Sequence, residues 1–231
     1  MFEFFVLKKS RPLSFISVLL FLLAGFFSFP GLAGASPVAG KKIFFARGCA
    51  GCHNVKGLPA GETIKTFSRR KGPELWYSGS KFRDGFIERW LKDPRPLRPL
   101  KYNSLKEKNR AGHVRLSAGE AREVAGYLMS LKSTGVKAAG IRPGVDVNGR
   151  IVFIKKFACY SCHRVRVRGK AVGGVSGPDL IGVDERLNPD WIFAFLADPR
   201  AFRPVSRMPV YKGLMSEKDL RALSSYVAGL R

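Results

Sequence analysis

Apolar side chains recur at helical spacing in the middle of each half of the chain. Phe82, Phe86 and Trp90 lie four residues apart, and Trp191 and Phe195 repeat this spacing further on. Apolar residues at such intervals share one face of a helix. The pattern therefore predicts a helix with a buried aromatic face in each half.

Helices are also predicted on both sides of these segments. Residues 40–48 and 149–158 are apolar stretches with interspersed lysines and arginines. The last segment of each half begins with a serine followed three residues later by an acid, which is typical of a helix start with a capping box. These pairs are Ser117 with Glu120 and Ser216 with Asp219. The buried stripes predicted for the two helices are Val124, Leu128 and Leu131, and Leu223, Val227 and Leu230.

The matching order of these segments indicates a duplicated domain. An Asp-Pro-Arg motif at residues 93–95 returns at 198–200, which is an offset of 105, and a Gly-Pro-x-Leu motif at 72–75 returns at 177–180 with the same offset. Self-similarity of one long unit is the mark of tandem domains. We expect an all-α fold with domains at residues 36–135 and 148–231, joined by a linker at 136–147 rich in glycine and small residues.

The N-terminus is expected to be a targeting segment. Three basic residues precede an uncharged apolar run of 17 residues at 13–29, and Ala33-Gly34-Ala35 follows it. A positive flank, an apolar run and a small-x-small site predict a secretory signal, residues 1–35, cut after Ala35. The alternative is an uncleaved anchor, because 17 residues is near the shortest length that spans a bilayer. Both alternatives place the remainder outside the cytoplasm, in the periplasm or on the outer face of the cytoplasmic membrane.

Charge narrows the range of partners. Residues 36–231 carry 38 basic and 16 acidic side chains, a net charge of +22. Such a charge favours encounter with acidic proteins and with anionic lipid headgroups. An acidic extracellular milieu is a further explanation of so basic a surface. Nucleic acid is not expected as a partner, because the chain is predicted to be exported and has no recognisable nucleic-acid-binding module.

Two Cys-x-x-Cys-His motifs, at residues 49–53 and 159–163, carry the chemistry. A redox disulfide would leave the adjacent histidine of both motifs without a role. A zinc site using all four cysteines would need ligands 107 positions apart, far outside the usual spacing. Covalent attachment of a c-type haem uses every position, since two thiols bind the vinyl groups and the histidine reaches the iron. The motifs therefore favour two covalently attached haems, on Cys49, Cys52, Cys159 and Cys162.

Both halves resemble class I c-type cytochrome domains. The shared features are a helix leading into Cys-x-x-Cys-His, a Gly-Pro-x-Leu motif, a middle helix, a distal loop and a final helix. The resemblance implies that His53 and His163 are proximal iron ligands. It also implies that the carbonyls of Pro73 and Pro178 accept the proximal imidazole N–H, which fixes the orientation of the ring.

The resemblance also implies which helices pack together. The first and last helices of each domain should cross, near Phe44 with Tyr127 in the first domain and near Ile154 with Tyr226 in the second.

In this family the sixth iron ligand is typically a methionine before the last helix, often followed by proline. Met208, which Pro209 follows, fits that position in the second half. The rival is Met215, which lies beside the start of the last helix and is expected to be a packing residue. A neutral thioether favours ferrous iron and raises the potential.

The first half departs from the family pattern. The counterpart of Met208 at the offset of 105 is Asn103, and Met129 falls within the last helix, where packing is its expected role. His113 is the one histidine outside the two motifs, and it lies in the expected distal loop. We predict that His113 is the sixth ligand; the alternatives are an open site or a donor among Tyr102, Lys101 and Asn103.

The resulting expectation is an exported dihaem cytochrome c that transfers electrons between redox partners, within a respiratory chain, and is not an enzyme. Acidic redox proteins or a membrane respiratory complex are the expected partners. A second hypothesis is a haem enzyme or haem subunit, acting on peroxide or sulfur compounds at an open first haem. A third is a permanent subunit of a membrane oxidoreductase, if residues 13–29 remain uncut.

Overall fold

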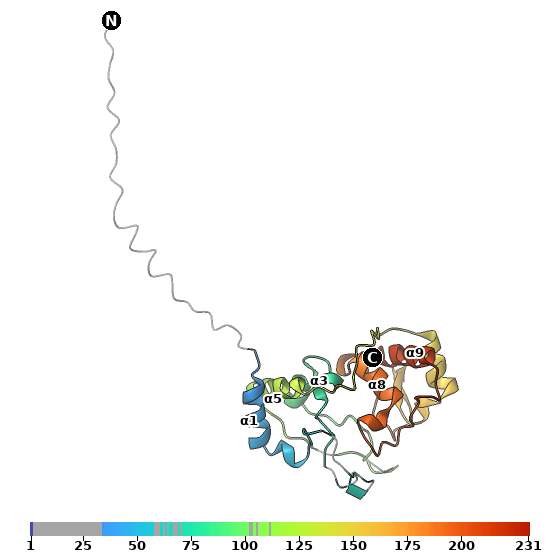
Figure 1. Ribbon diagram of the computed structural model, residues 1–231, viewed down its shortest axis with the longest axis horizontal. Coiled ribbons are helices and arrows are strands. Elements are labelled where there is room, and N and C mark those ends of the chain that lie inside the picture. The colour runs from blue at the N-terminus through green and yellow to red at the C-terminus, as the bar shows by residue number, and fades with distance from the viewer. Residues whose placement is uncertain are drawn as a thin grey trace. The chain divides into compact units, whose positions relative to one another are not determined.

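The computed structural model describes residues 1, 34–57, 61, 63, 65–66, 69, 71–101, 104, 106–110 and 112–231. The chain divides into two units, Met1–Gly34 and Ala35–Arg231. The expected signal segment at residues 13–29 lies outside the described residues. None of the helices in the described part is long and apolar enough to cross a membrane. Both Cys-x-x-Cys-His motifs lie in Ala35–Arg231 (Figure 1).

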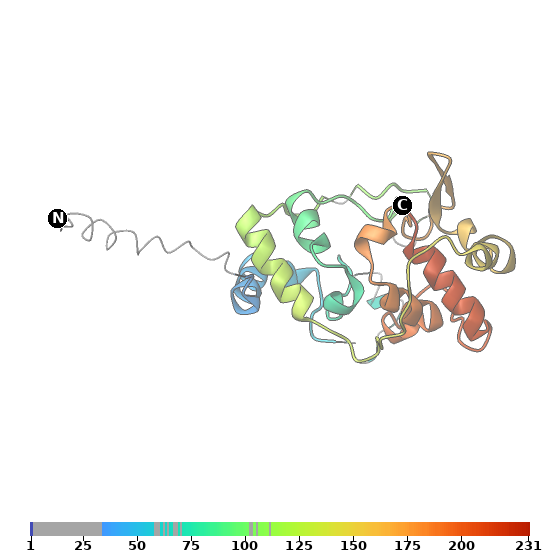
Figure 2. The same cartoon turned by 90° about the horizontal axis from the view of Figure 1, so that it is seen from above.

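The first repeat is built around a crossing of its first and last helices. Its elements are α1 (Pro37–Ala46), η1 (Cys49–Gly51), α3 (Ser78–Lys81), α4 (Phe86–Lys92) and α5 (Ala118–Ser130). Gly40 of α1 lies against α5, and a Cβ there would stand 2.6 Å from the carbonyl carbon of Glu123. The rings of Phe44 and Tyr127 meet edge to face at 5.6 Å, as predicted. Figure 2 shows α1 in blue against α5 in yellow-green.

The second repeat has the same order of helices and, as far as the described residues of the two repeats can be compared, further short elements. Its elements are α6 (Val147–Ile151), the π-helix η2 (Val152–Lys156), η3 (Cys159–Ser161), β1 (Arg164–Val167), β2 (Lys170–Gly173), α7 (Val183–Arg186), α8 (Pro189–Ala197), η4 (Pro199–Ala201) and α9 (Glu217–Ala228). Gly149 lies against α9, where a Cβ would stand 2.7 Å from Cβ of Tyr226. The helix crossing of the first repeat is therefore repeated here.

The predicted contact between Ile154 and Tyr226 was wrong by one residue. Phe153 packs on Tyr226 with ring centres 5.5 Å apart, whereas Ile154 is 38% exposed. Cys159 lies ten positions after Gly149, whereas Cys49 lies nine positions after Gly40. The π-helix absorbs the extra residue, because its wider turn adds one residue without moving the ends of the helix.

Strands β1 and β2 form an antiparallel hairpin that was not predicted. Its turn places Arg168 and Gly169 at φ angles of +48° and +78°. Positive φ at two successive residues is the geometry of a tight hairpin turn. The alternation of valine with basic residues in residues 164–168 is the signal that could have shown it.

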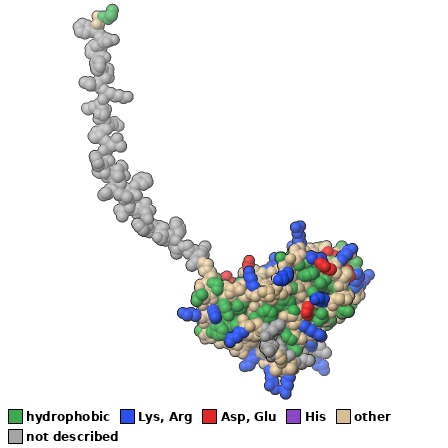
Figure 3. Space-filling view, in the orientation of Figure 1, with side chains coloured by type: hydrophobic (Ala, Val, Ile, Leu, Met, Phe, Trp, Pro, Cys, Tyr) green, Lys and Arg blue, Asp and Glu red, His purple; other side chains and the backbone are tan. Residues whose placement is uncertain are grey.

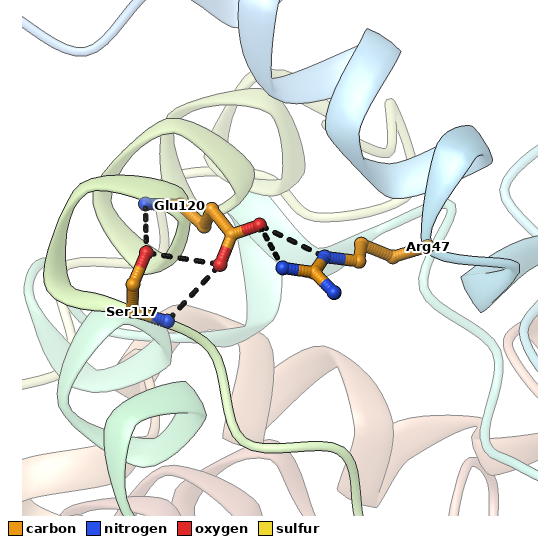
Figure 4. A network of polar contacts seen from close by, with 3 residues as sticks. All are labelled: Arg47, Ser117 and Glu120. Carbon is orange, nitrogen blue, oxygen red and sulfur yellow. Dashed lines mark hydrogen bonds and ion pairs between the residues drawn. The ribbon is translucent and has the colours of Figure 1, made fainter.

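A charged pair ties the first helix to the cap of the last helix in each repeat. Ser117 caps α5 in a full capping box with Glu120, as predicted, and the Glu120 carboxylate also accepts from Arg47 at the end of α1 (Figure 4). In the second repeat Lys156 donates to Asp219 at 2.8 Å, and Asp219 lies three residues after its cap, Ser216. The same ion pair between the first helix and the start of the last helix thus occurs in both repeats.

The two repeats meet at a seam between equivalent residues. Phe82 forms an antiparallel bridge with Leu187, its counterpart at the offset of 105. The amide of Arg83 donates to the carbonyl of Arg186 at 3.0 Å, and the amide of Asn188 donates to the carbonyl of Lys81 at 2.8 Å. Arg83 and Asn188 are counterparts at this offset, and so are Lys81 and Arg186. Each of the two bonds is therefore the equivalent of the other, and the seam has local two-fold symmetry.

The apolar core follows this arrangement. One buried cluster belongs to the first repeat, around Phe44 and Val124. The other belongs to the second repeat and also takes in Tyr77 of the first, with Trp76 packed against it. Helix α3 therefore lies beside α8 of the other repeat (Figure 1). The second core is completed by side chains from the first half of the chain.

Candidate functional site

A tight turn presents each motif histidine. In the first repeat the amide of His53 donates to the carbonyl of Cys49 at 3.0 Å, and Gly48 enters the turn with a positive φ of 69°. In the second repeat the amide of His163 donates to the carbonyl of Cys159 at 3.0 Å. The residue that enters this turn is Ala158, which adopts a φ of +45° without being glycine. Both turns bring two cysteines and a histidine onto one short loop.

The Nδ1 atom of each motif histidine faces a proline carbonyl. The distance is 2.9 Å from His53 to Pro73 and 2.8 Å from His163 to Pro178. A carbonyl only accepts hydrogen bonds, so the proton of a neutral ring is assigned to Nδ1. The lone pair on Nε2 is then free to bind a metal ion.

The glycine before each proline makes this contact possible. A Cβ on Gly72 would stand 2.6 Å from Cε1 of His53, and one on Gly177 would stand 2.7 Å from Cε1 of His163. Any side chain would push the ring away from the carbonyl. The two Gly-Pro pairs in the sequence therefore serve the orientation of the histidines.

The protonation of these groups suits metal ligation and not thiol redox chemistry. Burial lowers the pKa of both His53 and His163, which favours the neutral ring that binds metals. Burial raises the pKa of the Cys49 thiol, and it raises the pKa of Cys159 to about 11. Reactive redox cysteines have lowered pKa values. The raised pKa values of Cys49 and Cys159 are the opposite of what a reactive redox cysteine shows.

His113 lies close to His53 in the first repeat. The centres of the two rings are 5.9 Å apart, and the ring of Trp90 packs edge-on against His113 at 4.6 Å. The Nδ1 atom of His113 lies 2.9 Å from the carbonyl of Val114, which again assigns the proton to Nδ1. Imidazole nitrogens bind metal ions at about 2 Å, so two rings on opposite sides of one ion have centres about 6 Å apart.

The sequence around both turns matches a known protein family. The profile of the family described as Cytochrome c matches residues 37–132 and 147–231. The chain belongs to the cytochrome c family. A search of curated proteins gave no match.

Membership of the cytochrome c family accounts for the two repeats. Each matched segment is one cytochrome c domain, and the boundaries follow the helix crossings of the two repeats. Such domains hold covalent c-type haem and transfer electrons. In this cytochrome c, a hollow of about 540 Å³ lies beside the first motif, lined by residues that include Phe45, Cys52 and His53.

The other candidate donors of the first domain are Lys101, Tyr102, Asn103 and Met129. Lys101 forms an ion pair with Glu107, with Nζ 2.5 Å from the carboxylate. A protonated ammonium has no lone pair to give to iron. Tyr102 and Asn103 lie outside the described residues. Met129 is partly buried against the first core, in keeping with the packing role predicted for it.

In the second domain two methionines lie near the core. Met215 is 8% exposed and is part of the core, as expected for a packing residue. Met208 is only partly buried at the edge of that core, and its amide donates to Ser206 Oγ at 3.2 Å. Met208 is therefore the methionine with a side chain outside the closed core, and it remains the predicted sixth ligand.

Trp90 is a residue whose role the sequence did not show. Its spacing with Phe86 predicted only core packing, but its ring contacts His113 and its Nε1 donates to the carbonyl of Arg95 at 2.9 Å. This bond fixes the indole, and the indole supports the imidazole. The contact joins α4 to a loop more than twenty residues later, so no local pattern could reveal it.

Proposed function

We propose that the chain binds two c-type haems and carries single electrons between redox partners in a respiratory chain. One haem is held by Cys49 and Cys52, and the other by Cys159 and Cys162. The observation that carries the proposal is the repeated proximal arrangement, in which a motif histidine faces a proline carbonyl across a glycine. When bound, each haem supplies reversible one-electron chemistry at its iron.

The protein's own residues orient the ligands and set their protonation. The carbonyls of Pro73 and Pro178 hold the rings of His53 and His163 with Nε2 free. His113 is the proposed second ligand of the first haem, and Met208 that of the second. Two imidazoles give a lower potential than imidazole with thioether, so the first haem is proposed to be the low-potential one.

The basic surface is proposed to recruit the partners. Lys and Arg side chains are spread over the face seen in Figure 3, with few acidic ones among them. The net charge of +22 on residues 36–231 attracts acidic redox proteins, or a membrane respiratory complex at an anionic membrane surface. Exposed charges are screened by salt, so association should weaken as ionic strength rises.

Export is part of the same proposal. The apolar run at residues 13–29 and the small residues around Ala35 support a secretory signal, and covalent haem domains suit a location outside the cytoplasm. The periplasm or the outer face of the membrane is the proposed site of action.

An enzyme with an open first haem is the less supported function. It needs a free position opposite His53, and we propose that His113 occupies that position, which the 5.9 Å between the two ring centres supports. We therefore propose a carrier and not a peroxide or sulfur enzyme.

The test uses the full-length protein matured with haem. We expect two haems per chain, and rapid oxidation of the reduced protein by an acidic soluble redox protein at a rate that falls steeply with salt. Peroxide turnover no faster than that of free haem is expected alongside. Peroxide turnover well above that level, with slow transfer to every acidic acceptor tested, would overturn the proposal in favour of an enzyme.

A further inference from the structure

One peptide group joins the proximal turn of the second domain to the backbone of the first domain. The carbonyl of Pro178 faces Nδ1 of His163 at 2.8 Å, and the amide N–H of Asp179 belongs to the same peptide group. This N–H donates to the carbonyl of Leu97 at 3.0 Å. Leu97 lies in the first domain, in the segment that follows α4. Two hydrogen bonds therefore run in series from the imidazole of one domain to the backbone of the other.

A further hydrogen bond fastens the same segment to the same turn. The guanidinium of Arg98 donates to the carbonyl of Ser176 at 2.6 Å. Ser176 lies two positions before Pro178, and Leu97 and Arg98 are both half-buried. The first domain thus contacts the proximal turn of the second domain on both sides of its Gly-Pro pair.

The connecting segment, residues 95–99, is fixed within the first domain. Its sequence is Arg-Pro-Leu-Arg-Pro, and each proline restricts φ to about −65°. At its start the carbonyl of Arg95 accepts from Nε1 of Trp90 at 2.9 Å. At its end the carbonyl of Pro99 accepts from the amide of Asn109 at 2.8 Å. The position of the Leu97 carbonyl is therefore set by the structure of the first domain.

Asp179 is likewise held within the second domain. Its carboxylate accepts from Nε of Arg164 at 3.0 Å, and its carbonyl accepts from the guanidinium of Arg186 at 2.6 Å. Arg164 directly follows His163 in the chain. The peptide group between Pro178 and Asp179 therefore has little freedom to rotate away from its partners in the two domains.

Hydrogen bonds in series strengthen one another. When a peptide N–H donates, the carbonyl of the same peptide group becomes more polarised and accepts more strongly. A stronger acceptor at Nδ1 of His163 makes Nε2 a more basic ligand. A more basic ligand stabilises ferric relative to ferrous iron. The bond from Asp179 to Leu97 should therefore lower the potential of the second haem.

We propose that the first domain tunes the second haem through this peptide group, with Leu97 as a positioning residue that acts on His163. The inference rests on the proposed function, because it needs a haem iron bound to His163. It goes beyond the bond between His163 and Pro178, which the second domain makes by itself. The potential of one haem is then set in part by the backbone of the other domain.

The experiment measures both haem potentials in the full-length holoprotein carrying Asp179→Pro or Asp179→Ala, after confirming two haems per chain by mass and by haem absorbance. Both variants lose the carboxylate that pairs with Arg164, but only proline also lacks the amide N–H. We expect the equilibrium constant for reducing the second haem to be about threefold higher in Asp179→Pro than in Asp179→Ala, or about 28 mV for one electron. The potential of the first haem should be the same in both.

Asp179→Asn is the control for the side chain. It keeps the amide N–H and removes the negative charge, so the second haem should have the same potential in this variant as in Asp179→Ala. Equal potentials of the second haem in Asp179→Pro and Asp179→Ala, with two haems bound, would overturn this inference alone. Fewer than two haems in the wild-type protein would overturn the proposed function as well.

A measurement on the wild-type protein covers the case in which Asp179→Pro fails to fold. In the fully reduced holoprotein, nuclear magnetic resonance should show a coupling through the hydrogen bond between the amide nitrogen of Asp179 and the carbonyl carbon of Leu97. The same amide should exchange slowly with solvent. Rapid exchange of the Asp179 amide without this coupling would overturn the inference, because the two domains would then not be joined at this peptide group.

Discussion

The imidazole rings of His53 and His113 lie with their centres 5.9 Å apart, although 60 positions separate the two residues in the chain. Each ring has Nδ1 against a backbone carbonyl, that of Pro73 or that of Val114. In each neutral ring the proton is thereby assigned to Nδ1, which leaves the lone pair on Nε2. The distance supports the proposal that His113 is the second ligand of the first haem.

Replacing His113 should open the iron of the first haem. In His113→Ala the first haem should change from a low-spin to a high-spin ferric signal, because water binds where the imidazole was, and its potential should rise. Free imidazole added to the solution should restore the low-spin signal. Electron paramagnetic resonance of the oxidised holoprotein provides the measurement.

The matched control for this variant is Val114→Ala, which changes an exposed neighbour in the same loop. It should leave the spin state unaltered. A first haem that stays low-spin in His113→Ala without added imidazole would show that another residue is the ligand.

Replacing Met208 should remove the thioether from the second haem. Met208→Leu should abolish the near-infrared sulfur-to-iron band and lower the potential of the second haem by on the order of 100 mV, since axial ligands set haem potentials over a wide range. The band is measured in the oxidised protein. Met215→Leu is the control, because Met215 is a core residue and its loss should leave the band intact.

Adding a methyl group at Gly72 or Gly177 should disturb the proximal histidine of that domain alone. An Ala side chain at Gly72 would approach within 2.6 Å of the His53 ring, so the ring must move away from the carbonyl of Pro73. We expect Gly72→Ala to change the resonance signal of the first haem and to lower its yield of attachment. Gly177→Ala should do the same for the second haem.

The control for the glycine variants is Gly119→Ala in α5, where a Cβ would meet no atom within 4 Å. It should preserve both signals. Equal behaviour of Gly72→Ala and Gly119→Ala would show that contact with the histidine ring is not what requires glycine in the Gly-Pro motif.

The ion pairs of Arg47 with Glu120 and of Lys156 with Asp219 should make the stability of the protein depend on pH in the acid range. Hydrogen bonding to Arg47 and Ser117 lowers the pKa of Glu120, and hydrogen bonding to Lys156 lowers that of Asp219. A carboxyl group whose pKa is lower in the folded than in the unfolded state stabilises the fold at any pH above its unfolded-state pKa, which is near 4.5 for Glu and 3.8 for Asp. This stabilisation is lost as the pH falls through the folded-state pKa.

Glu120→Gln should therefore have a lower Tm than the wild type at pH 7, and the difference should shrink as the pH falls below about 4. Thermal unfolding followed by circular dichroism across this range measures it. Glu185→Gln is the control, because Glu185 is an exposed acid on α7 and belongs to neither ion pair. Its Tm difference from the wild type should not change with pH in this way. A Tm difference for Glu120→Gln that stays constant down to low pH would contradict the assignment.

Much of the fold could be predicted because its signals are local. The capping box of Ser117 with Glu120 and the contact of Phe44 with Tyr127 follow from short motifs and from the resemblance of the repeats to a known domain, and both predictions are confirmed. The contact predicted for Ile154 was wrong because a π-helix adds one residue to the turn, and helix periodicity assumes that none is added.

The seam could not be predicted, because it depends on how two similar surfaces meet. The Phe82 and Leu187 bridge joins positions 105 residues apart, and each segment alone resembles the ordinary end of a short helix. The ligand role of His113 was reached by elimination among few donors. It stays a prediction, now supported by the distance to His53.

The most direct test of a two-haem carrier is a spectroelectrochemical titration of the full-length holoprotein, with the absorbance of each haem followed against potential. We predict two one-electron steps from two low-spin haems, the lower step from the first domain and the higher from the second. A single haem, or a first haem that is high-spin in the resting protein, would contradict this prediction.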